Sequence, residues 1–147
     1  ARMAADQAGM TDRVEVHQGF YEDLPVANAS VDVVISNGVL NLAPDKRQVL
    51  GEISRVLKPG GRLYLADVVV QRELSAEARS NPDLWAACVA GALVEDELVM
   101  LANECGLAEG RVMQRFNCFY DTTAEARVAK DLFIQSVNFY ARKAADA

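Results

Sequence analysis

The chain has 147 residues, of which 51% are hydrophobic and 24% are charged, a composition typical of one folded domain and not of a disordered segment. Its net charge of −6, its pI near 4.8 and the lack of a basic stripe argue against nucleic acid as a partner. No apolar run approaches the roughly 20 residues that span a bilayer, and the first residues carry no apolar signal core. We therefore expect a cytoplasmic protein with no membrane partner.

The first half of the chain predicts alternating strands and helices. The expected elements are, in chain order, a helix over 2–8, strands over 14–18 and 31–36, a helix opening at Pro44-Asp45, and a strand over 63–70. The run over 31–36 is almost wholly apolar and β-branched, which is typical of a parallel strand covered on both faces. Alternating units of this kind favour a parallel sheet with right-handed crossovers.

The second half predicts more helix and then two closing strands. The expected elements are a short helix over 73–79, helices over 83–93 and 95–105, a helical turn or loop over 123–130, and strands over 111–119 and 133–142. The last two strands lack a long helix between them, so we expect an antiparallel finish. The whole chain, 1–147, is predicted to be a single α/β domain, a mostly parallel sheet flanked by helices.

Three segments carry a resemblance to a known family. Residues 18–25 are similar to the acidic loop that lies beside the adenine in class I S-adenosylmethionine-dependent methyltransferases. Residues 31–42, an apolar strand that stops at Asn37, resemble the fourth motif of that family, and Leu-Lys-Pro-Gly-Gly at 57–61 resembles its turn. The resemblance covers residues 5–143 and implies a partial Rossmann-like sheet with S-adenosylmethionine as cofactor.

Two segments are similar to the arsenite methyltransferase branch of this family. They are residues 36–46, which end in Pro44-Asp45-Lys46, and residues 85–93, where Cys88 precedes an apolar Gly-Ala stretch. That branch uses a cysteine in this position to bind trivalent arsenic. The resemblance therefore implies a small-molecule acceptor, arsenite among the candidates, with Cys88 as a ligand and no resident metal.

Two further cysteines differ in their expected roles. Cys118, in a late predicted strand, is a candidate to converge with Cys88, whereas Cys105 precedes Gly106 at a helix end and is expected to pack. Arsenic(III) is soft and prefers sulfur. The alternative for Cys88 is a small buried apolar residue, the usual place of a free cysteine.

The resemblance places five residues beside the cofactor: Glu22, Asp23, Asn37, Gly38 and Val39. Asn37 ends a buried strand, where open α/β sheets bind ligands, although a turn Asn is the plainer interpretation. Glu22 and Asp23 are either adenine contacts or a solvated acidic loop. Phe20 departs from the family pattern, which often has an acid directly after the glycine.

The family's glycine-rich first turn has no counterpart in this sequence. No Gly-x-Gly occurs in the first 30 residues, so we expect the C-terminal portion of the fold, without two central strands and with weak or no cofactor binding by this chain alone. The strand over 31–36 would then have an exposed edge, which invites pairing with another chain. We expect a homodimer, or a rearrangement in which the strand over 14–18 covers this edge.

The leading hypothesis is a truncated, arsenite methyltransferase-like enzyme that is inactive alone. A second hypothesis is a non-catalytic dimeric relic or binding module of the methyltransferase fold. A third is a methyltransferase for a small organic acceptor such as a quinone precursor. Asp67, near the carboxyl end of its predicted strand, is a further candidate for the pocket mouth.

Overall fold

The computed structural model describes residues 1–117 and 134–145. Within them the chain forms α1 (Arg2–Gln7), β1 (Val31–Asn37), a 3-10 turn η1 (Leu40–Leu42), α2 (Lys46–Val56), β2 (Leu57–Val70), α3 (Ala76–Arg79), α4 (Pro82–Ala86), β3 (Leu93–Val94), α5 (Glu95–Glu104), β4 (Leu107–Phe116) and β5 (Ile134–Lys143). Among the elements of this part of the chain, no helix is long and apolar enough to cross a membrane.

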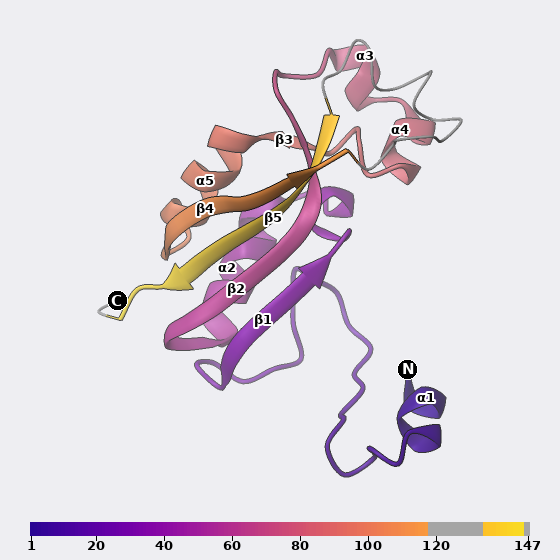
Figure 1. Cartoon of the computed structure of the whole chain (residues 1–147), viewed down its shortest axis with the longest axis vertical. Coiled ribbons are helices and arrows are strands. Elements are labelled where there is room, and N and C mark those ends of the chain that lie inside the picture. Colours follow the sequence, from indigo (N-terminus) through magenta and orange to yellow (C-terminus); the bar gives the residue numbers. More distant parts are fainter. Residues whose placement is uncertain (118–133, 146–147) are drawn as a thin grey trace.

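The strands form one sheet in the order β1-β2-β5-β4, with the short β3 beside the end of β2 (Figure 1). β1 and β3 run parallel to β2, whereas β5 is antiparallel to both β2 and β4. This confirms the predicted α/β sheet with parallel strands at the front and an antiparallel finish. The carboxyl ends of β1 and β2 therefore meet at one edge of the sheet.

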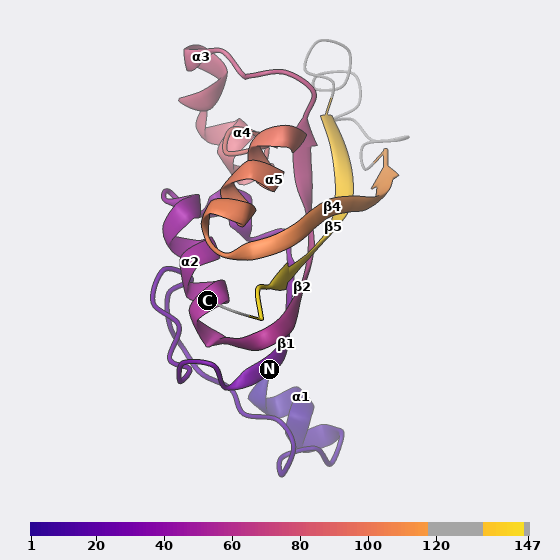
Figure 2. The same ribbon diagram turned by 90° about the vertical axis from the view of Figure 1, so that its left-hand side faces the viewer.

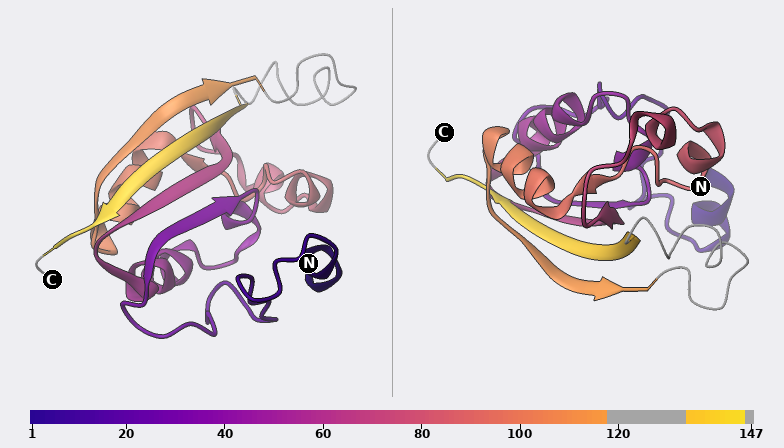
Figure 3. Two further views of the ribbon diagram at one scale, coloured as in Figure 1. Left: turned by 60° about the horizontal axis from the view of Figure 1, so that its bottom comes forward. Right: turned by 90° about the horizontal axis from the view of Figure 1, so that it is seen from above.

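The helices α2 and α5 cover one face of the sheet, as the edge-on and top views show (Figures 2 and 3). The core lies between these layers, because alternate residues of β2 point toward the helices and are buried. Its members from the two helices and the two central strands include Val49, Leu50, Ile53, Leu63, Leu65, Leu98, Ala102, Val137 and Phe139. Burial of this apolar surface is the main force that holds the helices to the sheet.

The helix α2 forms where the sequence predicts it, because its start is locally determined. The side chain of Asp45 accepts a hydrogen bond from the backbone N–H of Gln48 at 3.0 Å, which caps the first turn. At the other end the chain passes directly from Val56 into β2, and Gly60, near the start of that strand, has a φ of +76° that favours glycine. β2 begins at Leu57, earlier than expected, and its register against β1 shifts between Val31 and Val33.

The predicted strand over 14–18 is wrong: these residues are outside any strand, and Val14 is exposed. A strand needs a neighbour for its backbone groups, and among the described residues β1 pairs only with β2. The proposed rearrangement, in which 14–18 covers the edge of β1, is therefore also wrong. Ile35 on this edge strand has 78% of its surface exposed.

The predicted helix over 83–93 is wrong beyond Ala86, where α4 ends. Cys88 adopts a φ of +61°, and the backbone N–H of Val89 turns back to the carbonyl of Leu84 at 2.8 Å. Val89 is fully buried beneath this turn. Cys88 therefore lies in a turn and does not share a helix face with Trp85, although its N–H donates to the Trp85 carbonyl at 3.0 Å.

The two closing strands, expected over 111–119 and 133–142, are β4 and β5 with shifted bounds. The predicted helical turn or loop over 123–130 falls outside the described residues, as does Cys118.

Candidate functional site

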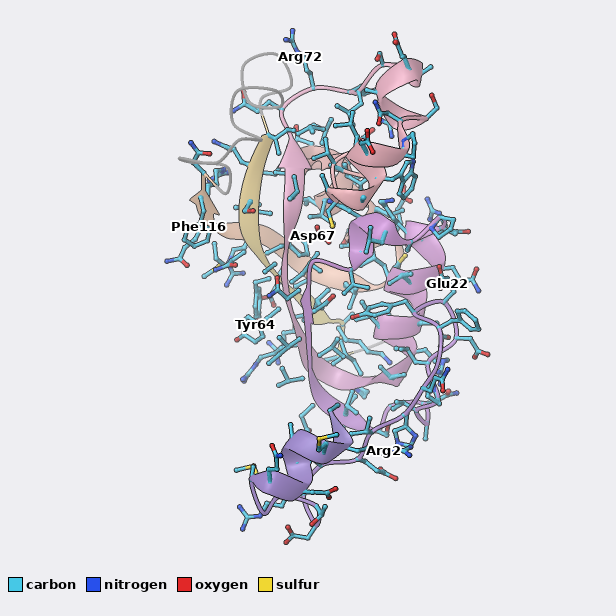
Figure 4. All side chains as sticks on the ribbon, turned by 90° about the vertical axis from the view of Figure 1, so that its right-hand side faces the viewer. Arg2, Glu22, Tyr64, Asp67, Arg72 and Phe116 are labelled. Atoms are coloured by element: carbon cyan, nitrogen blue, oxygen red, sulfur yellow. The ribbon has the colours of Figure 1, made fainter. Side chains whose placement is uncertain are left out.

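An open cavity of about 480 Å³ lies at the edge of the sheet where β1 and β2 end. Its wall combines the end of β1, the end of β2, the turn after α4 and the facing ends of β4 and β5. The lining residues that bear polar or sulfur groups are Asn37, Asp67, Cys88, Ser136 and Asn138. Phe116, at the end of β4, lines it on the side of β2 away from α2, as the labelled positions of Phe116 and Asp67 show (Figure 4).

Asn37 and Gly38 form the rim on the β1 side. The N–H of Gly38 donates to the carbonyl of Ala66 at 2.8 Å, which extends the parallel pairing by one residue. Gly38 then takes a φ of +67°, and the chain leaves the sheet there. Asn37 is exposed and also borders a second open cavity, of about 550 Å³, on the uncovered face of the sheet. Val39 follows in the same turn but lines neither cavity.

The thiol of Cys88 faces this rim. It donates a hydrogen bond to the carbonyl oxygen of Gly38, with a sulfur-to-oxygen distance of 3.7 Å. Burial raises the pKa of the Cys88 thiol above its ordinary value, and the nearby Asp67 carboxylate raises it further. At neutral pH the group is therefore a neutral thiol, held at the cavity wall.

Asn41 is the polar residue that the sequence interpretation missed. It is only 2% exposed, and its Nδ2 donates to the carbonyls of Val68 at 2.7 Å and Cys88 at 3.0 Å. It therefore joins η1 to the end of β2 and to the turn that carries the thiol. The sequence offers one signal for this role, an Asn between the apolar residues Leu40 and Leu42. A polar side chain buried in such a setting is normally hydrogen-bonded to another part of the chain.

Asp67 lies beside Asn41 and lines the cavity, where the sequence placed it at the pocket mouth. It is 6% exposed, and its carboxylate accepts from the backbone N–H groups of Val68 at 2.8 Å and Asn41 at 3.2 Å. Burial raises the pKa of Asp67, and these backbone donors together with the charge of Lys46 oppose the rise. The carboxylate thus fixes η1 against β2.

The acidic loop does not reach either cavity: neither Glu22 nor Asp23 lines one. Glu22 lies on the side of α2 (Figure 4), where its carbonyl accepts from Gln48 at 3.1 Å. The loop is tied to α2 because Arg55 donates to the carbonyls of Val26 and Leu24 at 2.9 and 3.0 Å.

The two aromatic residues at the start of this loop have different surroundings. Phe20 is 78% exposed and is not stacked in a cavity. The loop meets the sheet through Tyr21, whose hydroxyl lies 3.4 Å from that of Ser36, one residue before Asn37. The acidic loop therefore approaches the end of β1 without entering the cavity at which Cys88 lies.

Cys105 lies apart from the cavity and donates to the Arg47 carbonyl at 3.6 Å, between α5 and α2. This agrees with the packing role expected of it. Cys118 is outside the described residues, so its convergence with Cys88 stays a prediction. In residues 1–117 and 134–145, no three His, Cys, Asp or Glu side chains form a group that could hold a metal ion.

Comparisons with known proteins point to one family. The family model "Methyltransferase domain" matches residues 1–117. Human arsenite methyltransferase is 47% identical over 98 residues, which cover 65% of this chain and 26% of that protein. The arsenite methyltransferase of Aquipseudomonas alcaligenes is 41% identical over 104 residues, covering 69% of this chain and 30% of its own length. The chain thus spans less than a third of these curated relatives.

The structural comparison agrees. The crystal structure of an arsenic(III) S-adenosylmethionine methyltransferase from Chlamydomonas reinhardtii superposes with a TM-score of 0.76 and 34% identity. The match covers 88% of this chain and 44% of that one. The sheet and its helices are therefore those of a class I methyltransferase fold.

The raised pKa of Asp67 predicts a pH dependence of stability. Because the folded pKa lies above the unfolded one, this group favours folding fully below the unfolded pKa, and that contribution is lost as pH rises through the folded pKa. In Asp67→Asn the loss is absent, so the free energy of unfolding of the wild type, minus that of the variant, should fall as the pH rises above the ordinary aspartate pKa of 3.8. Urea unfolding at a series of pH values above this point measures the difference, and a constant or rising difference would contradict the assignment.

Proposed function

The chain belongs to the class I S-adenosylmethionine-dependent methyltransferase family, and from this premise we propose that its cavity binds trivalent arsenic through Cys88 as the methyl acceptor. One observation carries the proposal: a thiol is held at the wall of the cavity where the parallel strands end. Open α/β sheets bind ligands outside the carboxyl ends of their strands. Arsenic(III) is soft, so a thiol is its preferred protein ligand.

The binding step uses the proton that Cys88 retains. The sulfur of Cys88 forms a bond to arsenic while one arsenic–oxygen bond of arsenite breaks. The thiol proton leaves with the departing hydroxide as water, and the oxidation state of arsenic is unchanged. The high pKa of the thiol means that this exchange, and not prior ionisation, releases the proton at neutral pH.

The residues at the end of β1 fit the amino-acid part of the cofactor. Asn37 is exposed between the two cavities, and the open conformation at Gly38 leaves nothing within 4 Å of the position where a side chain would begin. Bound S-adenosylmethionine would supply an electrophilic methyl group on sulfur. The chain's own task is then to orient the acceptor and to exclude water, because positioning is the main catalytic contribution.

We also propose that the cofactor site is incomplete in this chain alone. Glu22 and Asp23 line neither cavity, and the first 30 residues contain no Gly-x-Gly turn through which backbone amides approach a nucleotide. The chain by itself would then hold the acceptor but would transfer no methyl group. Cys118 stays proposed as a second sulfur ligand.

The exposed edge of β1 supports a second proposal, in which this chain assembles as a homodimer and acts as a binding module. Within the described residues the outer edge of β1 has no strand partner, and Ile35 and Val33 are exposed on it. Unpaired strand edges template pairing with another chain. Two copies related by a two-fold axis would place their β1 strands side by side.

The first prediction concerns arsenite binding. Sodium arsenite should quench the fluorescence of Trp85, whose carbonyl accepts a hydrogen bond from the N–H of Cys88. Cys88→Ser should raise the half-saturating arsenite concentration by at least about tenfold, because a hydroxyl oxygen replaces the soft sulfur ligand. The matched control is Cys105→Ser, which removes a thiol away from the cavity and should bind like wild type. Equal quenching in wild type and Cys88→Ser would contradict the arsenic site and favour a small organic acceptor.

The second prediction concerns the cofactor. Isothermal titration with S-adenosylhomocysteine should give a dissociation constant of about 1 mM or weaker for this chain alone, because Glu22 and Asp23 line neither cavity and no Gly-x-Gly turn is present in residues 1–30. Micromolar binding would overturn the proposal that the site is incomplete.

The third prediction concerns assembly. Sedimentation equilibrium at about 100 μM should show a dimer for wild type and a monomer for Ile35→Lys, since a lysine on an edge strand blocks pairing. Met100→Lys places the same charge at an exposed position of α5 and should remain dimeric. A monomeric wild type, or a dimeric Ile35→Lys, would exclude pairing through β1.

A further inference from the structure

We propose that Asn41 is the positioning residue of the Cys88 thiol: its amide holds the turn that aims the sulfur at the cavity. The inference deepens the proposed function and rests on it for the identity of the ligand, arsenite. Asn41 does not itself line the cavity, so its side chain would act on a ligand there through the lining residues that it binds, Cys88 and Val68.

The contacts of Asn41 join η1 to two of the segments that line the cavity, the end of β2 and the turn after α4. Its Nδ2 donates to Val68 at the end of β2 and to Cys88 in the turn after α4, at 2.7 and 3.0 Å. Its backbone N–H donates to the carboxylate of Asp67 at 3.2 Å. The side chain thereby uses both of its amide hydrogens, and the residue is held from its main chain as well.

The contact between Asn41 and the Cys88 turn continues through Gly91. A Cβ atom added at Gly91 would lie 1.9 Å from the backbone oxygen of Asn41 and 3.1 Å from Nζ of Lys46. The backbone of the turn therefore lies directly against the backbone of η1, an approach that only glycine permits. The turn that carries Cys88 is thus fixed to Asn41 by two contacts, the hydrogen bond to the Cys88 carbonyl and the backbone packing of Gly91.

The turn needs such support because Cys88 has a φ of +61°. Residues with a Cβ adopt this left-handed conformation rarely, and it persists where the surroundings impose it. Asn41 binds the carbonyl of Cys88 itself, so it fixes the peptide plane that follows the strained residue. That plane and the φ of Cys88 together set the direction in which the thiol leaves the chain, toward Gly38.

The experiment compares two thiols in the same protein. The rates of alkylation by iodoacetamide at Cys88 and Cys105 are followed by mass spectrometry in the native chain, for wild type and Asn41→Ala. In Asn41→Ala the turn is released, so the alkylation rate at Cys88 should rise at least about fivefold relative to the rate at Cys105. Local opening of the turn exposes the Cys88 thiol and leaves the Cys105 thiol as it was. Sodium arsenite should bind about tenfold more weakly in the same variant, since its ligand is no longer aimed.

A second variant reaches the same contact from its other side. Gly91→Ala leaves Asn41 intact but forces the turn away from it, so it should reproduce the selective rise at Cys88. Asn41→Ser, which keeps one short donor, should give an intermediate rate and keeps the test usable if a more severe variant does not fold. The matched controls are Gly51→Ala, where a Cβ meets nothing within 4 Å, and Asn103→Ala on the exposed face of α5.

Three results separate the possibilities. Equal acceleration at Cys88 and Cys105 would show that Asn41 only stabilises the fold, and would overturn the positioning role. Unchanged alkylation in Asn41→Ala would overturn it as well. A selective rise at Cys88 in a protein whose wild type binds no arsenite would sustain the positioning role and refute the arsenic site of the proposed function.

Discussion

A buried polar junction between Asn41 and Asp67 joins the segments that meet at the cavity. Both residues are almost fully buried, and their hydrogen bonds tie η1 to the end of β2 and to the turn that carries Cys88. A buried donor or acceptor that loses its partner costs about 1–3 kcal/mol, so the members of such a group support one another. The junction is hydrogen-bonded to the turn in which Cys88 has a φ of +61°, a conformation that residues with a Cβ adopt rarely.

The apolar core and the cavity occupy different regions of the molecule. The helices α2 and α5 cover one face of the sheet with apolar residues, and this packing holds the strands in place without reference to any ligand. The cavity lies where that packing stops, at the ends of β1 and β2, and Phe116 is among its lining residues. The same chain leaves the outer edge of β1 unpaired within its described residues. The apolar core, the proposed acceptor site and the proposed dimer edge are thus three separate parts of the structure.

Sequence reasoning succeeded where local forces decide the structure. β1 is an apolar β-branched run, and α2 starts at an Asp45 cap, so both follow from neighbouring residues. It failed where distant residues decide. Residues 14–18 have the alternation of a strand but no partner, and the predicted helix over 83–93 stops early as its Gly91 packs on Asn41. The structure brought Asn37, Gly38 and Cys88 to one cavity and left Glu22 and Asp23 outside it. Asn41 was missed because its partners are 27 and 47 positions away along the chain.

The proposed acceptor site requires that Cys88 bind trivalent arsenic through its sulfur. Arsenic K-edge X-ray absorption on the chain with one equivalent of sodium arsenite tests this most directly, because sulfur and oxygen neighbours of arsenic scatter at different distances. We expect at least one sulfur neighbour in wild type and in Cys105→Ser, and a loss of sulfur scattering in Cys88→Ser. An arsenic atom surrounded only by oxygen in the wild-type protein, or sulfur scattering unchanged in Cys88→Ser, would contradict it.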